Sequence, residues 1–306
     1  MAIKKENILL IGATGFTGRR VIQQVENYNQ LAGSQNETLI ELTIFCRPKA
    51  TPPMWSDGSK IEVIRGDLDD IASLKNALHA KDGLFYIASL GFGHAPNIIQ
   101  ACEEEKVKRA VFISTTAIFT KLNAGSKKVR MEAEATVIGS DLDWTILRPT
   151  MIYGRKGDRN MERLIKYLKK WPIVFCPGDG QASQQPVFVD DVATSVVQSY
   201  FCKKAIRKSY NISGEYSLSF KSVVKSASKA LGKRHLFIPI PLGLCRFGLS
   251  IYEKLVKNPK LKEEQLLRLN ENKAFEHHHA TEDFNYTPRS FKDGISCLVE
   301  ELNSND

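Results

Sequence analysis

Short apolar runs alternate with longer helical segments from Asn7 to Leu147. The apolar runs are rich in β-branched residues and predict six strands, at Ile8–Ile11, Leu39–Phe45, Ile61–Arg65, Leu84–Ala88, Ala110–Ile113 and Trp144–Leu147. Helices are predicted between them, at Gly15–Asn27, Ile71–Leu78, Pro96–Glu105 and Lys128–Ile138, the last two with apolar residues at three- and four-residue spacing. This alternation is typical of repeated βαβ units and predicts a parallel sheet.

The regular alternation ends after Pro149. The following pattern predicts a cationic helix, an irregular stretch and a helix, at Asn160–Lys170, Trp171–Gly180 and Val189–Cys202. A strand, a helix, a second strand and mixed helix up to the carboxyl terminus then follow, at Ser209–Ile212, Ser219–Leu231, Leu236–Ile238 and beyond. We therefore expect a second, smaller region in this part of the chain.

The first strand leads directly into a glycine-rich turn and an amphipathic helix. The turn has the sequence Gly12-Ala13-Thr14-Gly15-Phe16-Thr17-Gly18. Gly12 allows a tight turn, Gly15 lets backbone amides approach a pyrophosphate at the helix amino terminus, and Gly18 lets the helix pack closely on the strand. At the first βα junction of a chain, this pattern favours a dinucleotide site over a purely structural turn.

The strand pattern and the glycine turn together predict an α/β fold. We expect a Rossmann-type doubly wound parallel sheet with a smaller C-terminal α/β substrate region. Residues 1–154 would form the NAD(P)-binding domain, to which 187–212 return, and residues 155–306 would form the smaller substrate-binding region.

The G-x-x-G-x-x-G spacing resembles the extended or atypical branches of the short-chain dehydrogenase/reductase superfamily, which include NAD(P)-dependent epimerase/dehydratase-like and NmrA-like proteins. Further stretches match the same pattern in order, namely Gly66–Asp69, Phe112–Thr116, Leu147–Gly154, Pro186–Ala193 and Asp283–Ile295. The resemblance therefore extends over most of the chain.

The resemblance implies a set of cofactor-binding residues. Asp67 and Leu68 would lie beside the adenine, although Asp67 also suits a turn residue or helix cap. Ala88 would line the pyrophosphate and ribose side. The loop against the nicotinamide would be formed by Pro149, Thr150 and Ile152, and the glycine turn and the fifth strand would add Thr14, Phe16, Thr17 and Ser114.

The end of the second strand carries a cation instead of an acid. Proteins that prefer NAD usually place an acid there to bind the ribose hydroxyls. Arg47 occupies this position, and Glu41 fits an outward-facing strand residue. A fixed cation suits the 2′-phosphate of NADP, so we expect NADP, with NAD as the alternative and a solvated loop arginine as the structural explanation.

The same resemblance implies a Ser or Thr that orients the substrate oxygen, and a Tyr four residues before a Lys as the proton-transfer pair. Thr116 fills the first position, with Ser114 and Thr115 beside it. Counted back from Glu134, the Tyr position falls on Ser126 and the Lys position on Arg130.

This pair departs from the family pattern. Serine lacks a phenol whose pKa can be tuned towards neutrality, and arginine stays protonated, so the usual proton transfer is not available to Ser126 and Arg130. Arg130 can still bond the nicotinamide ribose. Tyr153 is the nearest remaining phenol to a cofactor loop, either as a proton donor or as a packed aromatic residue.

Composition narrows the class of protein. The chain has 306 residues, 42% of them hydrophobic and 25% charged, which excludes disordered, collagen-like and coiled-coil proteins. The six cysteines are scattered without a C-x-x-C pair and predict reduced core residues. Three adjacent histidines, His277–His279, favour a solvated loop over a metal site, and His94 is expected to cap the helix near Pro96.

The chain is basic, with 43 Lys and Arg against 34 Asp and Glu, a net charge of +9. This charge suits a phosphorylated ligand, nucleic acid or an acidic membrane surface, and a solubilising lysine surface explains it equally well. The segment Ile238–Leu255, followed by Lys257 and Lys260, resembles an interfacial helix, although roofing a pocket or packing on a second subunit is the commoner role. No nucleic-acid-binding motif accompanies the charge, so we expect no nucleic-acid partner.

These observations lead to two functional hypotheses. The first is an NAD(P)(H)-dependent oxidoreductase or epimerase-like enzyme that acts on a small-molecule substrate as a monomer or homodimer. The alternative is a non-catalytic NADP(H)-binding redox sensor or scaffold, which the joint loss of Tyr and Lys predicts. No apolar run is long enough to span a bilayer and none resembles a signal peptide, so we expect a cytoplasmic protein.

Overall fold

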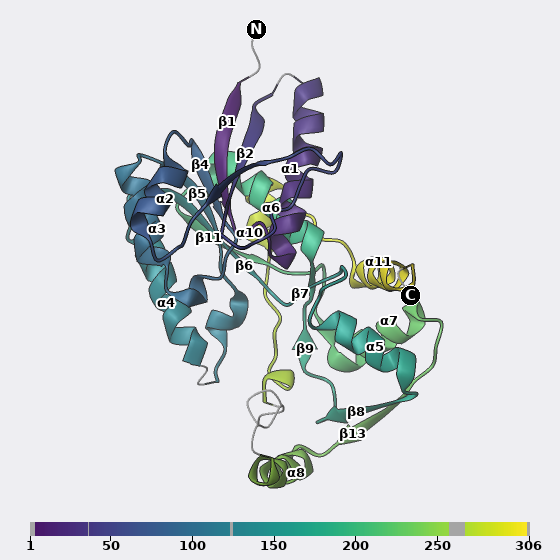
Figure 1. The fold of residues 1–306 in the computed structure, drawn as a ribbon. Coiled ribbons are helices and arrows are strands. Elements are labelled where there is room, and N and C mark those ends of the chain that lie inside the picture. Colours follow the sequence, from purple (N-terminus) through teal and green to yellow (C-terminus); the bar gives the residue numbers. More distant parts are fainter. Residues whose placement is uncertain (1–3, 36, 123–124, 257–266, 305–306) are drawn as a thin grey trace.

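The computed structural model describes residues 4–35, 37–122, 125–256 and 267–304. Its centre is a seven-stranded parallel sheet in the order β11-β6-β5-β4-β1-β2-β3 (Figure 1). The strands are β1 (Lys5–Ile11), β2 (Leu39–Cys46), β3 (Glu62–Arg65), β4 (Gly83–Tyr86), β5 (Arg109–Ile113), β6 (Asp143–Pro149) and β11 (Lys208–Ile212). The strand order reverses at β1, so the predicted Rossmann-type doubly wound sheet is confirmed.

Helices cover both faces of this sheet. The helices α1 (Phe16–Ser34) and α6 (Val189–Phe201) lie on one face, and α2 (Ile71–Leu78), α3 (Ala95–Glu104) and α4 (Gly125–Ile138) lie on the other (Figure 1). Along β1, Ile8 and Leu10 belong to the core under the first pair of helices, whereas Leu9 and Ile11 belong to the core under the other three. Burial on both faces explains why β1 is a continuous apolar run.

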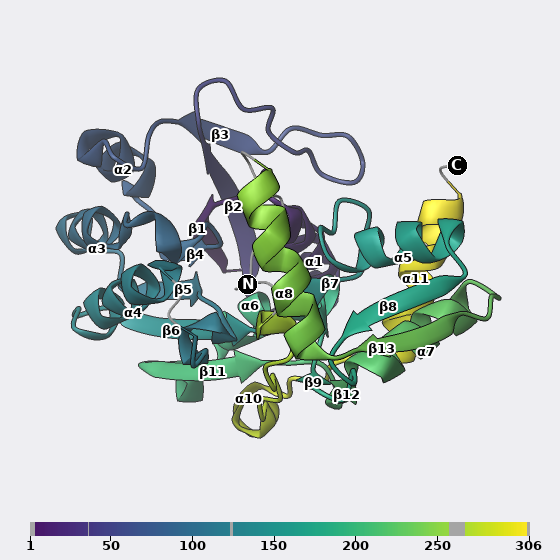
Figure 2. The ribbon, with the colours of Figure 1, turned by 90° about the horizontal axis from the view of Figure 1, so that it is seen from below.

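A second set of elements, which we call the small lobe, has its own hydrophobic core. Its elements are α5 (Met161–Lys170), β8 (Ile173–Pro177), α7 (Phe220–Ala230), β13 (Leu236–Ile240) and α8 (Leu242–Leu255), of which α8 contributes no residue to that core. The core includes Ile165, Val174 and Val223 and is completed by Ile295 from α11 (Phe291–Asn303). Figure 2 shows α8 beside the two-stranded ribbon of β8 and β13.

Short elements connect the two parts. They are the strands β7 (Ile152–Tyr153), β9 (Ser183–Gln184), β10 (Val187–Phe188) and β12 (Leu218–Ser219), the 3₁₀ turns η1 (Leu90–Phe92), η2 (Thr116–Phe119) and η3 (Lys203–Ala205), and the helix α10 (His278–Phe284). Strand β7 pairs with β10, and β9 pairs with β12. Among the described residues, no helix is long and apolar enough to cross a membrane.

Three sequence-based expectations about local structure were wrong. The segment Trp171–Gly180 is not irregular, because it contains β8, where Val174 and Cys176 are buried against the small-lobe core. Helix α1 does not end at Asn27 but continues to Ser34, since Ala32 is buried. The histidine segment is not a loop, because α10 begins at His278.

The cysteines were expected to be reduced and buried in the core, and only part of this expectation is confirmed. All six are free cysteines. Cys46, Cys102 and Cys176 are buried, whereas the other three, at 202, 245 and 297, are half-buried.

Candidate functional site

The glycine turn after β1 is built so tightly that two of its glycines are required by the fold itself. Gly12 has a φ of +97°, and a Cβ there would lie 2.6 Å from the backbone nitrogen of Ala88. A Cβ on Gly18 would lie 2.1 Å from the carbonyl oxygen of Gly12. Gly15 differs, because its φ is −77° and a Cβ would approach Gly12 O only to 3.3 Å. The fold therefore demands Gly12 and Gly18, whereas Gly15 mainly keeps space open.

The open space at Gly15 lies at the amino terminus of α1. Gly15 is the N-cap residue, no side chain caps the helix, and the first turn contains no acid. The first amides of a helix lack intrahelical partners, and the helix dipole makes this end positive. An uncapped, glycine-lined helix start of this kind suits a pyrophosphate.

A cationic hollow of about 880 Å³ borders the same turn. Its walls come from the start of α1, the loop after β7 and the end of α11, and its basic lining residues are Arg19, Arg20, Arg155, Lys156 and Arg159. Asp190 of α6 holds two of them, with Arg20 at 2.5 Å and Arg155 at 2.7 Å. Lys156 and Arg159 are exposed and have no ion pair within the described part of the chain. The hollow keeps uncompensated positive charge beside the glycine turn, which suits phosphate groups.

A smaller pocket of about 180 Å³ lies on the other side of the turn, between the ends of β4 and β5 and helix α4. Its lining residues are Thr17, Ile87, Ser89, Leu90, Ile113, Ser114, Thr115, Arg130 and Ile152. The hydroxyl of Ser114 is buried here without a hydrogen-bond partner. Buried polar groups are nearly always paired in folded proteins, so this hydroxyl fits a group that a ligand completes.

Arg130 supplies the positive charge of the small pocket. Its Nη1 donates to Ser126 Oγ over 3.0 Å, so the two residues at the expected Tyr and Lys positions contact each other. Burial lowers the pKa of Arg130, and the neighbouring Arg268 lowers it further. Neither group provides a proton near neutral pH.

The two remaining hydroxyls of interest are engaged inside the protein. Thr116 is buried and its Oγ1 donates to Pro149 O over 3.3 Å. Tyr153 is fully buried between Phe188 and Phe291, and its hydroxyl donates to Phe291 O over 3.4 Å. Burial raises the pKa of Tyr153 far above its ordinary value. Tyr153 is therefore the packed aromatic residue of the two alternatives that the sequence leaves open.

The loop after β6 is held from both sides. The backbone N–H of Thr150 donates to Ile212 O over 3.0 Å, and its Oγ1 donates to Gln185 O over 2.5 Å. Ile152 lines both the cationic hollow and the small pocket. Ile152 is therefore the residue of this loop that borders both cavities.

The end of β2 carries an exposed cation. Arg47 is exposed and has no ion pair in the described residues. Arg65 Nη1 donates to Pro48 O over 2.7 Å and so fixes the loop that follows Arg47. Glu41 pairs with Lys5 over 2.5 Å, near the opposite end of β2. Glu41 is therefore remote from Arg47.

Asp67 takes part in a turn before α2. Its Oδ1 accepts from the Asp69 amide over 3.1 Å, and Leu68 and Ala88 pack at the edge of the core below. The N-cap of α2 is Asp70, not Asp67. His94 is the N-cap residue of α3, but its ring contacts Asp69 over 3.0 Å and does not cap the helix.

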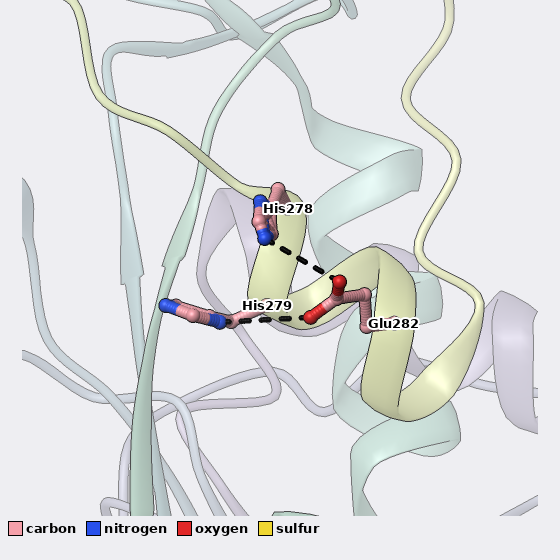
Figure 3. A group of neighbouring side chains, drawn as sticks. All are labelled: His278, His279 and Glu282. Carbon is pink, nitrogen blue, oxygen red and sulfur yellow. Dashed lines mark ion pairs between the residues drawn. The ribbon is translucent and has the colours of Figure 1, made fainter.

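The three histidines do not join this site. His278 and His279 lie on α10 and both contact Glu282, at 3.4 and 3.8 Å (Figure 3). His278, His279 and Glu282 are exposed. His277 is half-buried, and its Nδ1 lies 2.8 Å from Ser213 Oγ. The absence of a metal site stays a prediction.

The sequence analysis missed the charge network that shapes the cationic hollow. The sequence analysis assigns neither Asp190 nor Arg155 to the cofactor site. The structure brings both to Arg20 of α1, which is 170 residues away from Asp190 in the chain. A single sequence has no local signal for such a pairing.

Comparison with known proteins identifies the family of this chain. The model of the NAD(P)H-binding family matches residues 12–171. The chain belongs to this family. It is a member of the extended or atypical short-chain dehydrogenase/reductase superfamily, whose oxidoreductase and epimerase-like proteins bind a nicotinamide cofactor. The uncapped helix, the open space at Gly15 and the unpartnered Ser114 hydroxyl fit that cofactor.

The relatives of this NAD(P)H-binding protein are distant. The chloroplast stem-loop binding protein of 41 kDa b from Arabidopsis thaliana is 24% identical over 250 residues, which cover 76% of this chain and 65% of that protein. Short-chain dehydrogenase/reductase family 42E member 1 from Macaca fascicularis is 24% identical over 235 residues, which cover 62% of this chain and 56% of that protein. This chain thus spans less than two thirds of either relative.

Solved structures of other proteins share this fold. The structure of dTDP-glucose 4,6-dehydratase from Bacillus anthracis in complex with NAD matches with a TM-score of 0.74, over 98% of this chain and 97% of the other. The two sequences are only 14% identical, so this likeness shows the fold alone.

Proposed function

We propose that this protein is an NADP(H)-dependent oxidoreductase with a small-molecule substrate. The observation that carries the proposal is the unpartnered Ser114 hydroxyl beside the Arg130 cation, in a pocket that shares Ile152 with the cationic hollow at the glycine turn. One end of the site is suited to phosphate and the other to a polar substrate atom.

The chain's own residues have distinct roles in this proposal. The first amides of α1 bind the pyrophosphate, with Gly15 leaving room for it. Arg47 binds the 2′-phosphate and thereby favours NADP over NAD. Pro149, Thr150 and Ile152 cover the nicotinamide end and exclude water.

The dinucleotide, when bound, supplies or accepts the hydride. Ser114 donates a hydrogen bond to the substrate oxygen and orients it. Arg130 stabilises negative charge on the same oxygen, as a fixed cation does in a partly buried site. No residue lining the small pocket titrates near neutral pH, so the proton comes from water.

A non-catalytic redox sensor or scaffold is the second candidate. The observation that favours it is that the hydroxyls of Thr116 and Tyr153 are both engaged inside the protein. Such a protein would bind the dinucleotide at the same residues and never turn it over.

The division of the chain is part of the proposal. Residues 1–154 together with 187–212 form the cofactor unit, and 155–306 supply the substrate region. Two features support this: β11 pairs with β6 in the large sheet, and the small lobe has a separate core.

A titration of purified protein with NADPH and with NADH tests the cofactor assignment. We expect tighter NADPH binding, weakened about tenfold to a hundredfold in Arg47→Ala with NADH little changed, because a charge-assisted bond is lost. Lys60→Ala is the matched control, since Lys60 is an exposed cation in the loop between β2 and β3.

Each other outcome is informative. Equal affinity for both dinucleotides would contradict the NADP preference, and failure to bind either would remove both the enzyme and the sensor. Turnover with a panel of carbonyl compounds then separates those two, because a sensor leaves NADPH unoxidised.

A further inference from the structure

Helix α8 has no buried residue among those whose burial the structure describes, 242–253. Its outer face presents Leu244, Phe247 and Ile251, which are 62%, 67% and 44% exposed. The spacing of three and four residues places them along one stripe. Contiguous exposed apolar side chains of this kind mark interaction surfaces.

The ribbon of β8 and β13 repeats this pattern. Ile173 and Phe175 pair with Leu236 and Ile238, so the four side chains lie on one face. Phe175 and Leu236 are 56% and 60% exposed, whereas Val174 on the opposite face is buried. The outer face of the ribbon is therefore apolar, with Phe175 and Leu236 exposed and Ile173 and Ile238 half-buried.

The two apolar surfaces lie together at one end of the molecule. Figure 1 places α8 and the ribbon at the end opposite the amino terminus. Figure 2 looks onto that end and shows α8 and the ribbon side by side, with no other element drawn in front of α8. Trp171, which is 52% exposed, lies two residues before the first residue of β8.

Cations lie beside the ribbon, along the groove between α7 and β13. Helix α7 carries an exposed stripe of Lys221, Lys225 and Lys229, and the loop to β13 adds Lys233 and Arg234. These five line one groove of about 770 Å³ between α7 and β13, and none has an ion pair within the described residues. Residues 216–256 contain seven Lys and Arg against one Glu, and so hold six of the nine net positive charges of the chain.

We propose that this end of the small lobe docks on an anionic lipid bilayer. Exposed apolar side chains that insert at the headgroup level, bordered by lysines, form the pattern of an interfacial protein. Each lysine near an anionic leaflet adds to the attraction. The proposal is independent of the cofactor assignment, since none of these residues lines the glycine turn or the small pocket.

Two other occupants fit the surface less well. A second copy of the chain would bring the same patch onto itself about a two-fold axis, and the uncompensated lysines would then face one another. A nucleic acid would match the charge but would leave the aliphatic side chains of α8 uncovered, since bases stack on aromatic rings.

Co-sedimentation with vesicles tests the proposal on the full chain. We expect binding to vesicles of phosphatidylcholine with about 30% phosphatidylserine, and none to phosphatidylcholine alone, at about 0.1 M salt. Lys225→Glu/Lys229→Glu should lower the partition coefficient about tenfold or more. Phe247→Gln/Ile251→Gln should abolish the binding that persists at about 0.5 M salt, where charge attraction is screened.

The matched control is Lys60→Glu/Lys108→Glu, which changes the net charge equally at exposed positions of the large sheet's loops. We expect it to change binding less than about twofold. An equal loss in this control, or no sedimentation of the wild type, would overturn the proposal. So would a single-stranded RNA bound more tightly than the anionic vesicles, or a dimer that dissociates in Phe247→Gln while vesicle binding is unchanged.

Discussion

The two ends of the candidate cofactor site depend on different groups of the protein, backbone at one end and side chains at the other. The phosphate end is made of backbone: the φ of Gly12, the packing of Gly18 against Gly12, and the uncapped start of α1. The nicotinamide end is made of side chains, and there Thr116 and Tyr153 are bonded to carbonyl groups of the protein. Backbone geometry thus preserves dinucleotide recognition while the side chains of the usual proton transfer are absent or engaged elsewhere.

The largest effect is expected on stability, from a substitution in the glycine turn at the phosphate end. Gly18→Ala places a Cβ against the backbone of Gly12, where neither atom can move easily. We expect a loss of about 3 kcal/mol or more in the free energy of unfolding, measured by urea denaturation. A variant as stable as the wild type would show that the turn is looser than described.

A smaller effect is expected on catalysis at the nicotinamide end. Ser114→Ala should lower kcat/KM about tenfold to a hundredfold with the substrate found by the carbonyl screen, because a donor to the substrate oxygen is lost. Its affinity for NADPH and its stability should stay near those of the wild type, since the hydroxyl has no partner in the protein. A stability loss without a kinetic loss would make Ser114 a structural residue.

Thr116→Val should behave in the opposite way. The substitution removes the hydroxyl that donates to Pro149 O and leaves that carbonyl unpaired. We expect about 1–2 kcal/mol less stability and a kcat/KM changed less than that of Ser114→Ala. The pair of variants compares a buried hydroxyl without a partner with one that has a partner. A large kinetic loss in Thr116→Val but not in Ser114→Ala would show that Thr116, and not Ser114, orients the substrate oxygen.

The smallest expected effect is that of pH. Burial raises the pKa of Tyr153, so its phenol stays protonated and neutral across the neutral range and well above it. With no titrating residue in the small pocket, kcat/KM should be flat between about pH 6 and 9. A bell-shaped profile would reveal a proton donor that the described residues do not supply.

The sequence predicted the large sheet well because its strands are buried on both faces. Four consecutive apolar residues make β1 unmistakable, and the glycine turn that follows it is a local motif. It failed at β8, where the outward Phe175 is as apolar as the inward Val174, so no alternation marks the strand. The uncovered apolar face that hid this strand is the one that we propose docks on lipid.

The candidate site was also predictable only where a local motif marks it. Gly15 and Arg47 follow from their places after the first and second strands, and Arg130 from its spacing to Glu134. The absence of a partner for Ser114 and the bond of Thr116 to Pro149 depend on side-chain packing, and the link of Arg20 to Asp190 depends on the fold of the whole chain. Only the structure distinguishes these hydroxyls and ion pairs.

The central claim is that the phosphate end binds a dinucleotide through backbone groups, and Gly15→Ala tests it most directly. A Cβ there meets only Gly12 O at 3.3 Å, so the folded protein should lose less than about 1 kcal/mol. NADPH affinity, measured by calorimetric titration of wild type and variant, should fall about a hundredfold because the methyl group occupies the space of the pyrophosphate. Unchanged affinity in a folded variant would contradict the account.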